Sequence, residues 1–234
     1  MKLVILAGGY GTRISEETKI KPKPLIKIGD KPIIWHLMKI YSTFGIKEFI
    51  ICVGYKVYMI RKQLAKYQKI ENWKIKFVNT GLHTMTGGRV NRIKKYLDKD
   101  KNFCLSYGDG LSNINIKKLI KFHLDKNKIA TLTAVKYKNP KGILSINKTL
   151  NVNSIKEKPI EYINGGFFVL SDKIFKYLKN DKTIFEKDCL PKLSKNNQLL
   201  AFKHDGFWAC MDTLREKKEL NNLWKSKKSD WKIW

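Results

Sequence analysis

The feature that most constrains this chain is its start, where a short apolar run passes directly into a glycine-rich turn. Lys2–Ala7 has Leu-Val-Ile-Leu at its centre, which is typical of a buried strand, and Gly8–Gly11 (GGYG) follows at once. Glycine has no Cβ and accepts positive φ, so such a turn can bring backbone N–H groups close to a phosphate. Arg13 adds a fixed fork of donors, and Lys21 and Lys23 add point charges. The opening indicates a phosphate-binding loop, with an ordinary turn after a first strand left open as the alternative.

This loop follows neither of the two common phosphate-binding patterns. The G-x-G-x-x-G pattern needs a glycine at position 14, where the chain has Ile14. A P-loop ends in Gly-Lys-Ser or Gly-Lys-Thr, and the chain contains neither. What remains is G-G-x-G-T-R, followed ten residues after Arg13 by Lys23 in a Lys-Pro-Lys-Pro segment.

The first eighty residues alternate between strand and helix patterns. Lys31–Phe44 has apolar residues at helical spacing, Glu48–Val53 is an apolar run, Val57–Tyr67 has a helical pattern, and Trp73–Asn79 alternates. A β-α-β-α-β order favours a parallel sheet of Rossmann-like type. With 234 residues and 43% hydrophobic content, the chain can bury one large α/β core and is short for two.

The charge balance is strongly basic, with 48 Lys and Arg against 20 Asp and Glu. This balance suits either a nucleic-acid-binding protein or a lysine-rich enzyme that binds an anionic substrate. The lysines are spread along the chain, and no zinc-finger, RNP or helix-turn-helix signature occurs. We therefore do not expect nucleic acid as the main partner.

Neither a membrane span nor a secretion signal is expected. No stretch approaches the roughly 18 apolar residues of a membrane helix, and the first apolar run stops at Gly8 without a cleavage pattern. Cys52, Cys104, Cys189 and Cys210 show no C-x-x-C spacing, so we expect reduced thiols. These observations predict a cytoplasmic protein with no membrane partner.

A second glycine-rich segment, Thr80–Arg89, is expected to open a helix over Val90–Leu97. Helix N-termini attract anions and polar ligand edges. Thr84 and Arg89 are therefore candidates for contact with a bound nucleotide, and a plain capping loop is the alternative.

Two aspartates are candidate metal ligands. Asn102–Tyr107 has a strand pattern and runs into Gly108-Asp109-Gly110. The carboxyl end of a parallel strand is where α/β enzymes place ligand groups, and Mg²⁺ takes one or two carboxylates together with phosphate oxygens and water. Asp212 is the second candidate, although Asp212 or Thr213 would also suit the N-cap of a helix over Leu214–Trp224.

Two further segments contain residues that could contact phosphate or hydroxyl groups of a ligand. Lys158 lies in Glu-Lys-Pro, where a solvated lysine is the alternative interpretation, and Asn164 precedes Gly165 and Gly166 inside a strand-like run, Tyr162–Leu170. Glycine inside a strand often marks the close approach of a ligand, and an asparagine can both donate to and accept from hydroxyl groups. The other expected strands are 130–136, 143–146, 152–156 and 199–203, and the other expected helices are 114–127, 172–178 and 184–193.

The order of these motifs resembles that of a known family. GGYGTR, SEET, KPKP, KPIIWH, MTGGR, YGDG, EKP, INGGFF and FWACMDT occur in the order typical of the sugar-phosphate nucleotidyltransferases, and most closely of the glucose-1-phosphate cytidylyltransferases. The resemblance covers nearly the whole chain. It implies an α/β, Rossmann-like three-layer α/β/α fold with a mixed, mostly parallel central sheet. It also implies one domain over 1–234, with sugar-binding and C-terminal helical parts from about residue 140. The segment between Tyr67 and Trp73 is shorter than in the family.

The resemblance also implies roles for individual residues. It implies Asp109 and Asp212 as Mg²⁺ ligands and Arg13 and Lys23 as the groups that stabilise the leaving pyrophosphate. The sugar-phosphate contacts implied are Lys158, Asn164 and Gly165. The implied nucleotide contacts are Leu6, Ala7, Gly8, Gly9, Tyr10, Gly11, Thr12, Arg13, Lys23, Thr84, Arg89 and Gly108.

The implied reaction joins CTP and α-D-glucose 1-phosphate to give CDP-glucose and pyrophosphate, early in the biosynthesis of O-antigen lipopolysaccharide. Mg²⁺ is the implied cofactor, and a homo-oligomer is expected. A related enzyme that uses another NTP or sugar 1-phosphate is the first alternative, and a non-catalytic sugar-nucleotide-binding protein is the second. The choice of base comes from the resemblance alone.

Overall fold

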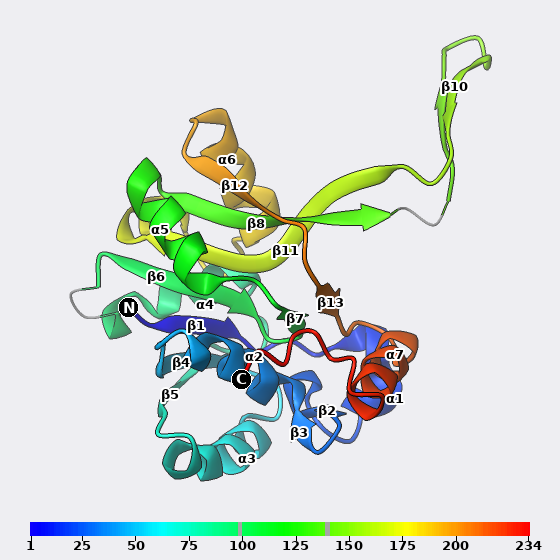
Figure 1. Cartoon of the computed structure of the whole chain (residues 1–234). Coiled ribbons are helices and arrows are strands. Elements are labelled where there is room, and N and C mark those ends of the chain that lie inside the picture. Colours follow the sequence, from blue (N-terminus) through cyan, green and yellow to red (C-terminus); the bar gives the residue numbers. More distant parts are fainter. Residues whose placement is uncertain (98–99, 139–140) are drawn as a thin grey trace.

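A seven-stranded sheet forms the centre of the computed structural model, which describes residues 1–97, 100–138 and 141–234 (Figure 1). Its strands are β1 (Leu3–Leu6), β4 (Glu48–Val53), β5 (Lys74–Asn79), β6 (Asn102–Tyr107), β8 (Ala130–Lys138), β11 (Ile160–Ser171) and β12 (Leu199–His204). Their order is β12-β8-β11-β6-β1-β4-β5. β11 runs antiparallel to β6 and β8, while the other neighbours are parallel. The expected mixed, mostly parallel sheet is confirmed.

Successive side chains of a strand point to opposite faces of the sheet, so the apolar strands carry buried side chains on both faces. Leu3 and Ile5 belong to one hydrophobic cluster, and Val4 belongs to the other. The first cluster takes residues from α2 (Ile33–Thr43), α3 (Val57–Ile70), α5 (Ile116–Lys126) and α7 (Leu214–Lys225). The second takes residues from α4 (Thr86–Arg92) and α6 (Leu190–Lys195). The sheet is therefore the middle of three layers.

Short elements connect this sheet to the cavity described below. α1 (Ser15–Thr18) follows the glycine-rich turn, and β2 (Lys27–Ile28) pairs with β3 (Lys31–Pro32). More important for the site, β7 (Gly110–Ser112) pairs with β13 (Trp208–Cys210), and the N–H of Met211 donates to the carbonyl of Asp109 at 3.1 Å. This pairing joins segments about a hundred residues apart in the sequence.

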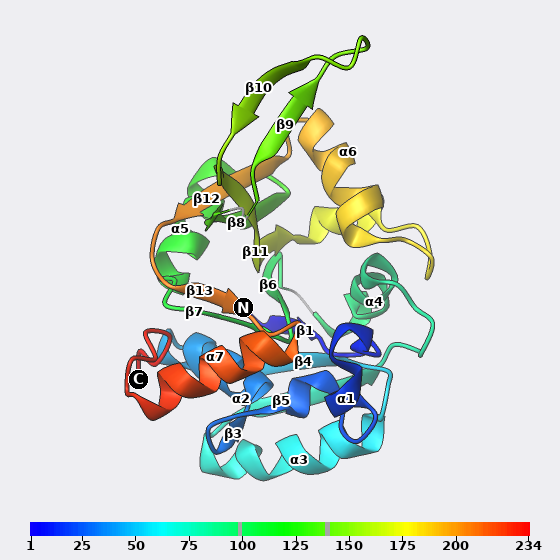
Figure 2. The same ribbon diagram turned by 90° about the vertical axis from the view of Figure 1, so that its right-hand side faces the viewer.

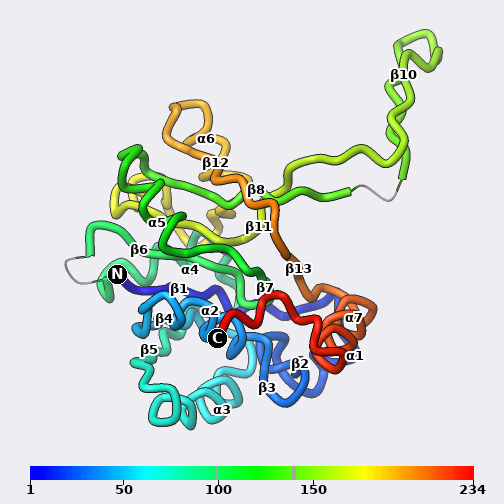
Figure 3. The backbone as a smooth tube through the Cα atoms, viewed as in Figure 1, coloured from blue at the N-terminus to red at the C-terminus, as the bar shows by residue number. Residues whose placement is uncertain are grey.

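A β-hairpin arm extends from the body beyond β8 and β11 (Figures 2 and 3). It contains β9 (Ile143–Ile146) and β10 (Val152–Lys156), which pair antiparallel. Every residue from 141 to 158 is exposed, so the arm adds nothing to the hydrophobic core. Among the described residues, no helix has the length and apolar character needed to cross a bilayer.

The second glycine-rich segment differs from the expectation. The helix begins at Thr86 and includes both glycines, ends at Arg92, and is followed by a short 3-10 turn, Lys94–Tyr96. A Cβ on Gly87 would lie 2.8 Å from the Thr183 carbonyl oxygen, and one on Gly88 would lie 2.6 Å from the Asp181 Cα. These glycines allow close packing against the chain at 181–183, which a reading of single segments does not reveal.

Two other expected helices also differ in form. Residues Asp172–Tyr177 make a 3-10 helix. Phe185–Cys189 is a π-helical turn that continues into α6. π-Helical turns are rare and often occur at functional sites, and this one carries a cavity residue, Glu186.

Candidate active site

The glycine-rich loop leaves the carboxyl end of β1 and forms part of the wall of a cavity of about 770 Å³. Gly11 has φ of 68°, and a Cβ there would lie 2.8 Å from Thr18 Cγ2, so the turn requires glycine. A Cβ on Gly9 would meet nothing within 4 Å. The loop is therefore closely packed at Gly11 and open at Gly9, where a ligand can approach the backbone.

Most of the residues expected in the site line this cavity. They are Leu6, Ala7, Gly8, Gly9, Tyr10, Gly11, Arg13, Lys23, Thr84, Arg89, Gly108, Asp109, Asn164 and Asp212. Thr12, Lys158 and Gly165 are not among the lining residues.

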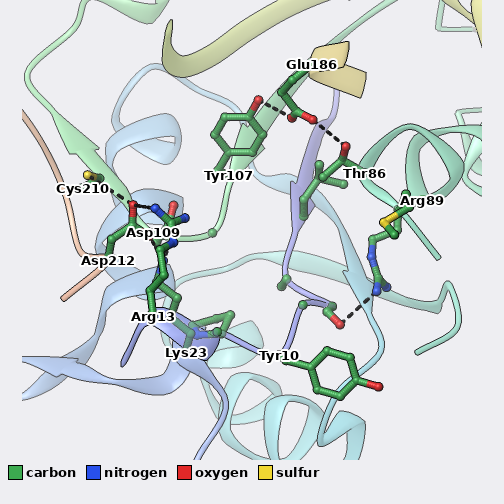
Figure 4. Close-up of a pocket in the computed structure, with 18 of the residues that line it drawn as sticks. Tyr10, Arg13, Lys23, Thr86, Arg89, Tyr107, Asp109, Glu186, Cys210 and Asp212 are labelled. Carbon is green, nitrogen blue, oxygen red and sulfur yellow. Dashed lines mark hydrogen bonds and ion pairs between the residues drawn. The ribbon is translucent and has the colours of Figure 1, made fainter. Parts of the chain in front are cut away.

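The two aspartates meet at one cationic group (Figure 4). Lys23 Nζ contacts Asp109 Oδ2 and lies 2.6 Å from Asp212 Oδ1. Arg13 Nη1 lies 2.5 Å from Asp212 Oδ2. Burial alone would lower the pKa of Lys23, but the two carboxylates outweigh this effect and raise it. Lys23 therefore stays charged between two acidic groups whose sequence positions lie far apart.

This donor set is chemically suited to magnesium. Mg²⁺ is commonly held by one or two carboxylates and completes its shell with phosphate oxygens and water. Asp109 follows β6, Asp212 follows β13, and both line the cavity beside the glycine-rich loop. Cys210 lies nearby, but burial, with Glu216 and Asp212 as neighbours, raises the pKa of its thiol to about 12. A protonated thiol is a poor metal ligand, so the two carboxylates are the candidates to hold a cation.

Arg89 has a structural position that the sequence did not suggest. Its side chain is buried, and burial lowers the pKa of its guanidinium. Nη1 donates to Thr80 Oγ1 at 2.7 Å and to the Gly81 carbonyl at 2.8 Å, while Nη2 donates to the Gly8 carbonyl at 3.1 Å. Arg89 therefore ties the glycine-rich loop to the 80–82 segment. Its proposed contact with a nucleotide stays a prediction.

A third group of cavity residues surrounds a carboxylate that sequence reasoning missed. Tyr107 Oη donates to Glu186 Oε1 at 2.6 Å, and Thr86 Oγ1 donates to Glu186 Oε2 at 2.7 Å (Figure 4). Tyr107 directly precedes Gly-Asp-Gly at a strand end, a position that could have singled it out. Glu186 lies in a segment that looks like an ordinary amphipathic helix, and nothing in its spacing marks it.

The other two expected sugar-phosphate contacts, Gly165 and Lys158, are not among the residues that line the cavity. Gly165 packs closely, since a Cβ there would lie 2.9 Å from Val135 Cγ1, and its carbonyl accepts from Trp208 Nε1 at 2.7 Å. Lys158 is exposed at the base of the arm, and its Nζ lies 3.8 Å from Glu157 Oε1. Their roles toward a sugar phosphate stay predictions. Thr213, rather than Asp212, caps α7, in a capping box with Glu216.

The sequence matches the family described as Nucleotidyl transferase over residues 2–220. It is 45% identical over 257 aligned residues to a glucose-1-phosphate cytidylyltransferase of Salmonella typhimurium, covering all of both chains. It is 41% identical to a probable glucose-1-phosphate cytidylyltransferase of Bacillus subtilis, again over the full length of both.

Solved structures share the fold of this chain. HddC from Yersinia pseudotuberculosis, in complex with GMP-PN, superposes with a TM-score of 0.76 at 29% identity, covering 95% of this chain and 99% of that one. A putative glucose-1-phosphate thymidylyltransferase from Bacillus anthracis, 20% identical, has the same fold with a TM-score of 0.76, covering 95% of this chain and 94% of that one. The chain therefore belongs to the nucleotidyl transferase family, with glucose-1-phosphate cytidylyltransferases as full-length relatives.

Proposed function

We propose that this protein transfers CMP from CTP to α-D-glucose 1-phosphate, giving CDP-glucose and pyrophosphate, and that the reaction depends on Mg²⁺. The observation that carries this proposal is the convergence of Asp109, Asp212, Lys23 and Arg13 beside the glycine-rich loop. The full-length similarity to cytidylyltransferases supports the choice of base and sugar.

The chemistry requires two anions to meet, and the residues of the cavity suit that task. The open backbone around Gly9 would receive the triphosphate. The side chain of Arg13 is 72% exposed and that of Lys23 is 12% exposed, so one exposed and one largely buried cation are available to the departing pyrophosphate. A magnesium ion held by Asp109 and Asp212 would neutralise phosphate charge.

No general base is needed, because the attacking phosphate of glucose 1-phosphate is already ionised. Its oxygen attacks the α-phosphorus of CTP in line, the bond to the bridging oxygen breaks, and pyrophosphate leaves on the opposite side. The contribution of the protein is then orientation and electrostatic stabilisation, as in other phosphoryl transfers.

Pyrophosphate release tests this proposal directly. The protein is incubated with glucose 1-phosphate, Mg²⁺ and each NTP in turn, with an EDTA control. We expect release with CTP that EDTA abolishes. Release with UTP or dTTP alone would overturn the cytidylyltransferase assignment, and no release with any NTP would overturn the enzymatic assignment. Release that persists in EDTA would contradict the metal dependence.

A further inference from the structure

The carboxylate of Glu186 is held from two sides in the wall of the cavity. The hydroxyl of Tyr107 donates to one of its oxygens at 2.6 Å, and the hydroxyl of Thr86 donates to the other at 2.7 Å. Figure 4 shows this group set apart from the Arg13–Lys23–aspartate cluster. A carboxylate fixed in this way presents hydrogen-bond acceptors in a defined direction.

Each of the two donors is itself held in place. Asn164 Nδ2 donates to Tyr107 Oη at 3.3 Å, and Asn164 Oδ1 accepts from the Gly166 N–H at 2.9 Å. The register of β11 against β8 shifts between Asn164 and Phe168, and Gly166 has φ of 77°. A Cβ on Gly166 would lie 2.6 Å from the Tyr107 ring, so this irregularity in β11 makes room for the tyrosine.

The hydroxyl of Thr86 is also held in place. Thr86 Oγ1 accepts from the N–H of Phe185 at 2.9 Å while it donates to Glu186. Residues from β6, α4, β11 and the π-helical turn therefore all contribute to positioning one carboxylate.

Glu186 retains unused acceptor capacity. A carboxylate has about four lone-pair sites, and the two hydroxyl groups occupy one on each oxygen. The residue lines the cavity, so a ligand can reach the remaining sites. These sites suit a donor-rich ligand group and disfavour a phosphate, which carries the same charge as the carboxylate.

The place of Glu186 in the cavity indicates which of the two substrates supplies the donor-rich group. The glycine-rich loop, with Arg13 and Lys23, provides the cationic surface for the triphosphate. Tyr107 lies two residues before Asp109 in the sequence, and both residues line the same cavity as Glu186. A sugar phosphate whose phosphate lies near Asp109 would bring its ring hydroxyls, which are good donors, toward this wall.

We propose that Glu186 is a specificity-determining residue that accepts hydrogen bonds from ring hydroxyl groups of the sugar 1-phosphate. The inference rests on the proposed function, because it assumes that a sugar phosphate is the acceptor. It assigns to Tyr107, Thr86 and Asn164 the positioning of that carboxylate.

The test combines Glu186→Gln with substrates that each lack one hydroxyl. Initial rates are measured with CTP, glucose 1-phosphate and its 2-, 3-, 4- and 6-deoxy analogues. We expect E186Q to raise the KM for glucose 1-phosphate about tenfold or more, as loss of a charged hydrogen bond does, and to leave the KM for CTP within about twofold. For the analogue that lacks the contacted hydroxyl, the variant and the unmodified protein should have similar kcat/KM.

Asp188→Asn is the matched control. Asp188 lies in the same π-helical turn, but its Oδ2 accepts from the Ile184 N–H at 2.6 Å, and it does not line the cavity. We expect D188N to reproduce any loosening of the turn without altering discrimination among the analogues.

The outcomes separate this inference from the proposed function. If the unmodified protein releases no pyrophosphate, the proposed function fails. If it turns over but E186Q loses activity equally on every analogue, Glu186 only supports the structure and the inference is overturned. A selective rise in the KM for CTP also overturns it, since that result would place Glu186 at the nucleotide.

Discussion

Gly8 and Gly9 are adjacent, but the packing of the protein requires glycine only at Gly8. A Cβ on Gly8 would lie 2.1 Å from Arg89 Nη1, so its absence makes room for the guanidinium that ties the loop to 80–82. A Cβ on Gly9 would meet no protein atom within 4 Å. Gly8 thus serves the fold, while the space beside Gly9 is available to a ligand.

Alanine at each position should separate these two roles. Gly8→Ala should lower the melting temperature by several degrees, because it displaces a buried, multiply bonded arginine. Gly9→Ala should leave the melting temperature unchanged and raise the KM for CTP, because the added methyl group would obstruct the triphosphate. Thermal melting and initial rates measure the two effects. Equal loss of stability in both variants, or an unchanged KM in G9A, would contradict this interpretation.

Asp212 offers a second test at the level of single residues. Asp212→Ala leaves Arg13 without the carboxylate that it contacts and leaves Lys23 with Asp109 alone. We expect turnover to fall by at least about 100-fold, because a ligand of the proposed metal is lost, while the protein stays folded. Asp205→Ala removes an exposed carboxylate paired with Lys136 and should keep full activity. Retained turnover in D212A would remove Asp212 from the proposed metal site.

At the scale of elements, the sequence predicts those strands and helices whose patterns are strong within one segment. β4 and β6 have the expected bounds because each apolar run ends directly before a glycine, Gly54 or Gly108. The pairing of β7 with β13 was not predicted, because a three-residue strand has too little pattern to identify its distant partner. Asp109 and Asp212 were named as a pair from the resemblance. Their contact with Lys23 depends on that pairing and is visible only in the folded chain.

The C-terminal segment shows another long-range arrangement, in which α2 and α7 meet around one histidine. His36 is fully buried, and its Nε2 donates to the Ile28 carbonyl at 2.9 Å. Its Nδ1 lies 3.5 Å from Trp231 Nε1, and that tryptophan is also fully buried. The rings in contact with His36 belong to Trp35, Trp224, Trp231 and Trp234. Burial, as the main cause, lowers the pKa of His36 from 6.5 to about 4.

This histidine should make the folded protein sensitive to acid. Because its pKa is lower in the folded state, the folded protein binds fewer protons than the unfolded chain. Above pH 6.5 the histidine does not lower the free energy of unfolding. As the pH falls from 6.5 toward 4, its protonation in the unfolded chain lowers that free energy by on the order of 3 kcal/mol in total. His36→Gln keeps a donor for the Ile28 carbonyl but does not titrate. Urea unfolding, followed by tryptophan fluorescence, measures the free energy of unfolding at each pH. Between pH 6.5 and 4 this free energy should fall more steeply in the unmodified protein than in H36Q, and an equal fall in both proteins would refute the effect.

At the scale of the whole molecule, the chain divides into a compact body and an exposed arm. The arm exposes large apolar side chains, including Leu144, Leu150 and Ile155, on a protein whose formal net charge is +28. Exposed apolar groups of this kind often mark protein contact surfaces, and the homo-oligomer stays a prediction. The arm also carries Lys158, which is expected to contact the sugar phosphate and lies outside the cavity.

Removing the arm tests its two expected roles, in assembly and in sugar-phosphate binding, together. Lys138 and Ile160 are partners in the β8–β11 ladder, so residues 139–159 can be replaced by Asn-Gly to close a tight hairpin. The shortened protein should still unfold cooperatively, because residues 141–158 are exposed and belong to neither hydrophobic cluster. Light scattering should give a multiple of 27.3 kDa for the intact chain and a smaller assembly for the shortened one.

Lys158→Ala is the control that decides between contact and assembly. If Lys158 binds the sugar phosphate, this variant should raise the KM for glucose 1-phosphate as much as removal of the arm does, without changing the molecular mass. We expect this result, because the ammonium group is a suitable partner for the phosphate and makes only a 3.8 Å pair with Glu157. If K158A matches the unmodified protein while the shortened chain loses both assembly and activity, the arm acts through assembly alone. The predicted role of Lys158 would then be wrong.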